Sequence, residues 1–92
     1  MNKKQIVEIT RILTDWNPLG IESEKILDET GYETEATDIL FHINSELFFK
    51  KSEDKEKRIS LIVNRVLNEA FNLNLTGNDC KKPAHEIYNL VK

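Results

Sequence analysis

Trp16-Asn17-Pro18-Leu19-Gly20-Ile21 is the stretch around which the N-terminal part of this chain must turn. It holds the only Trp, one of the two Pro and one of the three Gly. Apolar residues at three- and four-residue steps precede it and predict an amphipathic helix over residues 3–15. Pro18 disfavours helical backbone at Asn17, so the helix should end there. Trp and Leu beside a Pro-Gly break predict an anchored turn, with Trp16, Pro18 and Gly20 as its structural residues and Trp16 packed in the core.

Three further main helices are predicted after this turn. An apolar stripe from Tyr32 to Leu47 favours a helix over residues 33–50, and a second stripe from Ile59 to Phe71 favours one over residues 52–73. A last helix follows the turn at residues 75–78 and carries Pro83 in its first turn. Ile21, Ile26 and Leu27 also support a short helix of one or two turns, closed by Gly31 in a left-handed cap.

Capping signals support these boundaries. Thr30 and Glu33 resemble a capping box, with Thr34 as an alternative cap. The run Ser52-Glu53-Asp54 combines a cap with acids in the first turn of the next helix, and Asn78 or Asp79 is expected to cap the last one. The fold prediction is therefore all-α: residues 1–92 form a single domain, a compact antiparallel or orthogonal bundle of four main helices, with one short extra helix after the Trp-centred turn.

Composition excludes several classes of protein. Residues of the apolar type make up 39% of the 92 positions and charged residues 32%, which suits one small helical domain. Three Gly and two Pro are too few for the turns of a sandwich or barrel. No run of about 18 apolar residues predicts a membrane span. The single Cys80 has no partner for an internal disulfide, which fits a cytoplasmic protein.

Charge is distributed unevenly along the chain. The net charge is −3, but the stretch from residue 22 to residue 38, called the acidic segment below, carries seven acids against the single base Lys25. These acids either form a solvated face that offsets the dipole of the following helix or meet an electropositive partner. The candidate partner-binding residues are Glu22, Glu24, Asp28, Glu29, Glu33, Glu35 and Asp38.

Catalytic and metal sites are weakly represented. A thiol enzyme needs a histidine base beside its cysteine, but on a helix His85 points away from Cys80 and no oxyanion-hole turn accompanies either Cys80 or His42. We therefore interpret Cys80 as a small apolar core residue. His42 and Glu46 have a spacing that suits one metal ion on a helix, yet no second ligand pair follows. We expect no catalytic residue, no metal and no cofactor.

Phosphate and nucleic-acid binding are also disfavoured. The three glycines are isolated, so no glycine-rich phosphate loop is present. A basic cluster precedes the third main helix, but acids interleave with it, so we expect a solvated helix start and no nucleic-acid partner. The cluster consists of Lys50, Lys51, Lys55, Lys57 and Arg58. Beside it, Phe48 and Phe49 are adjacent and cannot both face one core, so one of them is a candidate for a dimer surface.

The order of these features resembles a known family. The Trp-centred hexapeptide, the acidic stretch leading to Tyr32, and a last helix that opens with Cys80 and Ala84 look like the small helical bacterial family of the YugE type, a domain of unknown function. The hallmark of that family is Trp-Asp/Asn-Pro-Leu/Ile-Gly followed by an acid-rich segment ending in Tyr. Many relatives have a compact Asp-Glu-Tyr-Asp-x-Tyr run, of which only Asp28, Glu29 and Tyr32 remain here, after a longer spacer.

The resemblance extends to small immunity proteins encoded beside secreted toxins, including contact-dependent inhibition systems, and it implies neither catalytic residues nor a cofactor. Secreted nuclease toxins tend to be basic because their substrates are polyanions. The favoured hypothesis is therefore a non-enzymatic module that neutralises a cognate toxin, for example a basic nuclease, through its acidic segment. The alternative is a cytoplasmic structural or regulatory protein that forms a homodimer through Phe48 and Phe49. A small enzyme or metal protein using His42, Glu46 or Cys80 is the third hypothesis.

Overall fold

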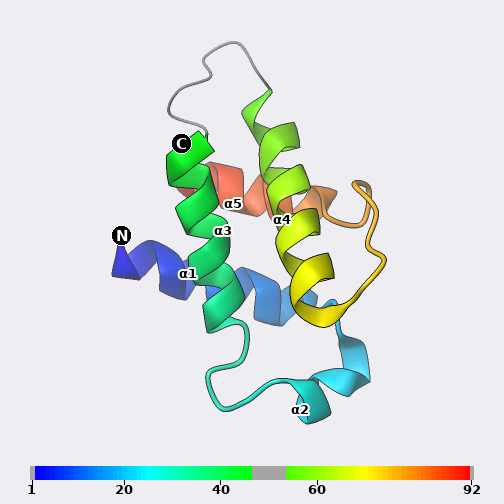
Figure 1. Ribbon diagram of the computed structural model, residues 1–92. Coiled ribbons are helices and arrows are strands. Elements are labelled where there is room, and N and C mark those ends of the chain that lie inside the picture. Colours follow the sequence, from blue (N-terminus) through cyan, green and yellow to red (C-terminus); the bar gives the residue numbers. More distant parts are fainter. Residues whose placement is uncertain (1, 47–53, 92) are drawn as a thin grey trace.

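Four long helices form two layers that cross at a steep angle. The computed structural model describes residues 2–46 and 54–91, which form α1 (Lys3–Trp16), α2 (Ser23–Ile26), α3 (Glu33–Glu46), α4 (Lys55–Phe71) and α5 (Lys81–Val91). In Figure 1, α3 and α4 stand side by side, and α1 and α5 lie behind and across them. Contacts join α1 to α3, α3 to α4, α4 to α5, and α5 back to α1. The all-α prediction with four main helices is confirmed, in its orthogonal form.

The short extra helix is also confirmed, but Gly31 does not cap it: α2 ends before Leu27, whose backbone is extended, and Gly31 takes its left-handed conformation (φ 62°) in the turn before α3. The turn after α1 leads into a 3-10 helix, η1 (Gly20–Glu22), and directly into α2. These two elements lie at the lower end of the view in Figure 1, beyond the layers of long helices. The segment that follows, residues 27–32, returns the chain to the start of α3.

The core lies between the two layers and draws on every long helix. The apolar stripes that predicted the helices supply it, because residues three and four apart share one helix face. Ile6 and Trp16 are only partly buried and pack at its edge, so Trp16 anchors the end of α1 without being enclosed. The buried apolar residues are Ile9, Ile12, Leu13, Leu19, Tyr32, Ala36, Ile39, Leu40, Ile43, Ile59, Ile62, Val63, Val66, Leu67, Cys80, Ala84 and Ile87.

Helix α1 has well-formed ends. Asn2 caps its start by accepting hydrogen bonds from the backbone N–H groups of Lys4 and Gln5. The helix ends at Trp16, one residue later than predicted, because Asn17 takes a left-handed conformation (φ 49°) and donates its backbone N–H to Leu13 O at 2.7 Å. Asn is one of the few residues besides Gly that adopt this conformation readily.

The start of α3 differs from the predicted capping box. Thr30 Oγ1 donates to Asp28 Oδ1 at 2.6 Å, and the Thr30 backbone N–H bonds the same oxygen at 3.0 Å. Thr30 Oγ1 therefore closes a turn with Asp28, while the Glu33 N–H donates to the carbonyl of Thr30. The capping-box prediction is wrong because a nearer carboxylate competes for the threonine side chain. Helix α3 is described up to Glu46, and the predicted continuation to residue 50 lies outside the described residues.

Side chains fix both ends of α4. Asp54 caps its start by accepting from the Lys57 N–H at 3.2 Å, whereas the predicted cap Ser52 lies outside the described residues. The helix ends at Phe71, before Asn72 in the left-handed conformation (φ 54°). The chain then runs back along α4, where Asn68 Oδ1 accepts from the Leu75 N–H and Asn68 Nδ2 donates to the Leu75 carbonyl.

The start of α5 lies later than the predicted caps. The helix begins at Lys81, so neither Asn78 nor Asp79 directly precedes it. Asp79 Oδ2 instead accepts from the Thr76 N–H at 2.9 Å, and Thr76 Oγ1 accepts from the Asp79 N–H at 3.2 Å. This reciprocal pair closes the turn that leads into the helix. Pro83 lies in the first turn of α5, as predicted.

Candidate functional site

The Trp-centred turn and the start of α3 meet at one buried hydrogen-bond junction. Tyr32, which is 1% exposed, donates its phenolic hydroxyl to Asn17 Oδ1 at 2.7 Å and accepts the backbone N–H of Leu19 at 3.4 Å. Asn17 Nδ2 donates to the carbonyl of Gly20 at 3.1 Å. Gly20 has a φ of 63°, a conformation that favours glycine. The Trp-Asn-Pro-Leu-Gly turn therefore holds Tyr32, and with it the start of α3.

Six of the seven predicted partner-binding acids lie at the surface. No ion pair to a cation is found for any of them within the part of the chain that the structure describes. Their negative charge is therefore not offset by an ion pair, and it projects into solvent along η1, α2, the connection between α2 and α3, and the first half of α3. The exposed acids are Glu22, Glu24, Asp28, Glu29, Glu33 and Asp38.

Glu35 is the exception among the predicted site residues. It is only 9% exposed, on the inward side of the first turn of α3. Burial raises the pKa of its carboxyl group and is the largest effect; a hydrogen bond from its own backbone N–H opposes it, and the carboxylates of Asp38 and Asp28 each raise the pKa by a smaller amount. Glu35 therefore contributes little to an external surface. Composition alone did not reveal this, although Glu35 lies three residues after Tyr32 and four before Ile39, at the spacing of the apolar stripe.

Asp28 has the opposite electrostatic setting. Its carboxylate accepts the hydroxyl and the backbone N–H of Thr30, and these two bonds lower the pKa of Asp28. The bonds also order the connection between α2 and α3. The carboxylate remains exposed, so it stays charged and available to a partner in a fixed orientation.

Two exposed isoleucines accompany the acids. Ile21 is 89% exposed and Ile26 is 49% exposed, whereas Leu27 is half-buried and packs against the core. The sequence pattern treats Ile21 and Ile26 only as support for a short helix. The signal that identifies them as surface residues is the shortness of that helix, because a segment of seven residues between two turns cannot bury apolar side chains on every side.

The candidate catalytic groups are dispersed. Cys80 is fully buried, and burial raises the pKa of its thiol to about 11, with Asp79 adding to the effect and Asn64 opposing it. A nucleophilic thiol requires a lowered pKa, so this environment disfavours the reaction. His85 is exposed, and its Nδ1 lies 2.8 Å from Glu56 Oε1, an interaction that joins α5 to α4. His85 therefore links two helices and lies at the surface.

The third hypothesis depended on a metal or a nucleophile. No group of three or more His, Cys, Asp or Glu side chains with the proximity needed for a metal ion occurs among residues 2–46 and 54–91. His42 is half-buried, and its ring meets that of Phe41 edge-on with centroids 5.7 Å apart. The side chain of Glu46, its proposed co-ligand, lies outside the described part.

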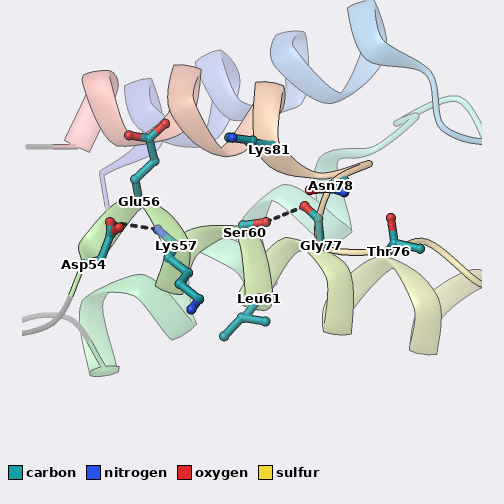
Figure 2. A pocket seen from close by; sticks show the side chains of 9 residues that line it. All are labelled: Asp54, Glu56, Lys57, Ser60, Leu61, Thr76, Gly77, Asn78 and Lys81. Atoms are coloured by element: carbon teal, nitrogen blue, oxygen red, sulfur yellow. Dashed lines mark hydrogen bonds between the residues drawn. The ribbon is translucent and has the colours of Figure 1, made fainter.

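A depression of about 630 Å³ lies where α4 meets the turn before α5. Figure 2 shows nine residues around it, including Glu56, Lys57 and Lys81, with a hydrogen bond of 3.0 Å from Ser60 Oγ to the carbonyl of Gly77. The hydrogen bond fastens the turn to α4. Acids and lysines alternate around the depression, so its charge favours neither an anion nor a cation, and we interpret it as the seam between α4 and the turn.

The remaining predicted surfaces fall partly outside the described residues. This holds for Phe48 and Phe49, on which the homodimer alternative depends, and for Lys50 and Lys51 of the basic cluster. In the rest of that cluster, two lysines are exposed and the arginine is half-buried. These are Lys55, Lys57 and Arg58.

Comparisons with known proteins identified no relative of this chain. A scan against protein-family models, a search of curated proteins and a search of solved structures each found no match. Across the described residues, no helix combines the length and the apolar character that crossing a bilayer requires. The function must therefore be argued from the surface itself.

Proposed function

We propose that this chain is a cytoplasmic, non-enzymatic binding module of the immunity type, which neutralises a cognate protein toxin through its acidic segment. The observation that carries the proposal is the set of six exposed carboxylates, without an ion pair among the described residues, on η1, α2, the connection after α2, and α3. A surface of one charge attracts a partner of the opposite charge and accelerates their encounter. The resemblance to small toxin-immunity proteins points to the same role.

The second support is the rigidity of the segment. Tyr32 and Asn17 join the two ends of the loop that carries four of its acids, and Asp28 orders that loop through Thr30. A surface that is ordered before binding loses less conformational entropy on association. The proposed mechanism is occlusion: the acidic segment covers the basic substrate groove of the toxin, where a polyanionic substrate would otherwise bind.

The test is a pull-down with the tagged full chain from its native cells, followed by a toxicity assay. We expect a basic protein in stoichiometric amount, captured at low salt and released at high salt. That protein, expressed alone, should arrest growth, and co-expression of the wild-type chain should restore it. The triple variant Glu24→Lys, Glu29→Lys, Glu33→Lys should lose both capture and rescue.

The matched control reverses exposed acids on other helices, Glu69→Lys and Glu86→Lys, which should leave capture and rescue intact. Equal capture by the triple variant, or a captured protein that has no effect on growth, would overturn the proposal. Recovery of the chain with itself only would overturn it as well and would favour the homodimer alternative.

A further inference from the structure

Ile21 is the most exposed of the large apolar residues in the described chain. It is 89% exposed on η1, compared with 57% for Val7 on α1 and 49% for Leu61 on α4. A single exposed isoleucine carries no meaning by itself, because folded proteins show many such residues. What distinguishes Ile21 is how its backbone is held and what surrounds it.

The backbone around Ile21 is fixed on both sides. On one side, Leu19 is 8% exposed in the core, and the carbonyl of Gly20 accepts a hydrogen bond from Asn17 Nδ2. On the other side, η1 continues into α2, and Leu27 packs against the core. The core residues that bracket this segment thus hold Ile21 outward. A backbone that is ordered before binding reduces the entropy lost when a partner covers the side chain.

Exposed acids follow this apolar side chain in the sequence. Glu22 is the next residue and Glu24 lies two positions further, and both are exposed. An apolar side chain with charged neighbours is the arrangement of an interface hot spot and its rim. The same carboxylates would be repelled by the anionic surface of a membrane, which argues against insertion of Ile21 into lipid.

We infer that Ile21 is the apolar anchor of the acidic segment and inserts into an apolar recess, bordered by lysine or arginine side chains, on a protein partner. The charge complementarity of Glu22 and Glu24 selects that border, and Ile21 fills the recess. This inference rests on the proposed function, because it specifies the chemistry of the partner that the acidic segment binds. It assigns different tasks to the two groups: the carboxylates speed association, and Ile21 slows dissociation.

The test is site-specific photocrosslinking with the full chain in its native cells. The variant Ile21→p-benzoylphenylalanine carries the probe, and Val7→p-benzoylphenylalanine is the matched control on α1. Mass spectrometry of the adduct from position 21 should identify apolar residues of the partner with Lys or Arg nearby, and the control should give no such adduct. Adding Glu22→Lys and Glu24→Lys to the position 21 variant should abolish the adduct.

Binding kinetics with the crosslinked partner, purified, provide the second measurement. Ile21→Ser should weaken the complex by about tenfold or more, mainly through faster dissociation, while Val7→Ser changes it less than about twofold. Glu22→Lys with Glu24→Lys should mainly slow association. Thermal unfolding of each variant verifies that the fold is retained.

The outcomes separate the two proposals. A partner that the pull-down captures but that position 21 does not label would overturn the anchor while leaving the proposed function intact. A lipid adduct, an adduct on an acidic surface, or an unchanged dissociation rate in Ile21→Ser would also overturn the anchor. Absence of any partner in both experiments would overturn the proposed function along with it.

Discussion

Tyr32 donates its hydroxyl to Asn17 Oδ1 at 2.7 Å, across 15 positions of the chain. The bond joins Asn17, which caps the end of α1, to Tyr32, which precedes α3. The Tyr32 ring also packs edge-on against the ring of Phe71 in α4, with ring centroids 6.1 Å apart. The two parts of the motif that the sequence separates, the Trp-centred turn and the tyrosine after the acids, are therefore one structural unit. Residues 18–31 between them, which carry four of the seven acids, form a loop closed at this junction.

The junction predicts that Tyr32→Phe destabilises the fold without disrupting its packing. The change removes the hydroxyl that bonds Asn17 and leaves the Leu19 N–H without its buried acceptor. Loss of buried hydrogen bonds of this kind costs about 1–2 kcal/mol. Chemical denaturation should show a lower free energy of unfolding and an unchanged dependence on denaturant concentration.

Asn17→Gly tests the same bond from the other side. Glycine accepts the left-handed conformation of Asn17, so the backbone is preserved and only the side-chain bonds are lost. If the two side chains act as a pair, the double variant with Tyr32→Phe should lose less stability than the two single losses added together. Strict additivity would show that the bond contributes no coupling.

Glu35 predicts an unusual dependence of stability on pH. Because its pKa is raised in the folded state above the ordinary value of 4.5, the folded chain holds the proton more tightly than the unfolded chain does. The contribution of Glu35 to the free energy of unfolding is therefore fully present below pH 4.5 and is lost as the pH rises through the pKa that Glu35 has in the folded state. Glu35→Gln should stabilise the fold near neutral pH relative to the wild type, with a smaller effect in acid.

Glu33→Gln, at an exposed position two residues away, is the control and should not reproduce this pH-dependent gain. The same two variants also distinguish an effect on folding stability from an effect on partner binding. Because Glu35 is buried, Glu35→Gln should leave capture of the partner unchanged, whereas Glu33→Gln removes one exposed charge. Loss of capture in Glu35→Gln alone, with the fold retained, would contradict the assignment of Glu35 to the interior.

The sequence was sufficient to predict the long helices, because the period of apolar residues is a local signal that the core obeys. Leu19 becomes buried for a different reason: it meets Tyr32 across a turn, and no local period shows that meeting. The capping box failed at Thr30 because Asp28, two residues earlier, offers its carboxylate to the same hydroxyl. Local patterns identify possible partners, and the three-dimensional fold decides among them.

The candidate site was predictable only in outline. Composition identified the acidic segment, and six of its seven acids are exposed. It could not separate Glu35 from its neighbours, since the direction of each carboxylate depends on where the first turn of α3 faces. The sequence also did not reveal that Ile21 is exposed, because an isoleucine in a helical segment is usually assigned to the core.

Cys80 predicts slow thiol chemistry in the folded state. Its thiol is fully buried and has a pKa raised to about 11, so the reactive thiolate is scarce near neutral pH. Labelling with a disulfide reagent should be slow in buffer and fast in denaturant. Fast labelling of the folded chain would revive the nucleophile hypothesis.

The raised pKa of Cys80 also affects stability. Because it favours the thiol form in the folded state, the contribution of Cys80 to stability should be lost as pH rises from 9.0 through about 11.

Asn68 predicts a local loss of order when its side chain is removed, because it binds both backbone groups of Leu75 in the connection between α4 and α5, whereas Asn64 donates only to the Leu75 carbonyl. Its amide both accepts the Leu75 N–H, at 2.9 Å, and donates to the Leu75 carbonyl, at 3.1 Å, which mimics a backbone pairing. Asn68→Ala removes both bonds and should lower the free energy of unfolding by about 1–3 kcal/mol. Asn68→Asp keeps the acceptor but places a carboxylate against the Leu75 carbonyl, so it should not restore the lost stability.

Hydrogen exchange of the Leu75 amide checks the mechanism directly. Exchange at Leu75 should accelerate in Asn68→Ala, while the amides in the middle of α1 change only as far as global stability falls. An unchanged Leu75 exchange rate would show that the connection is held by other contacts.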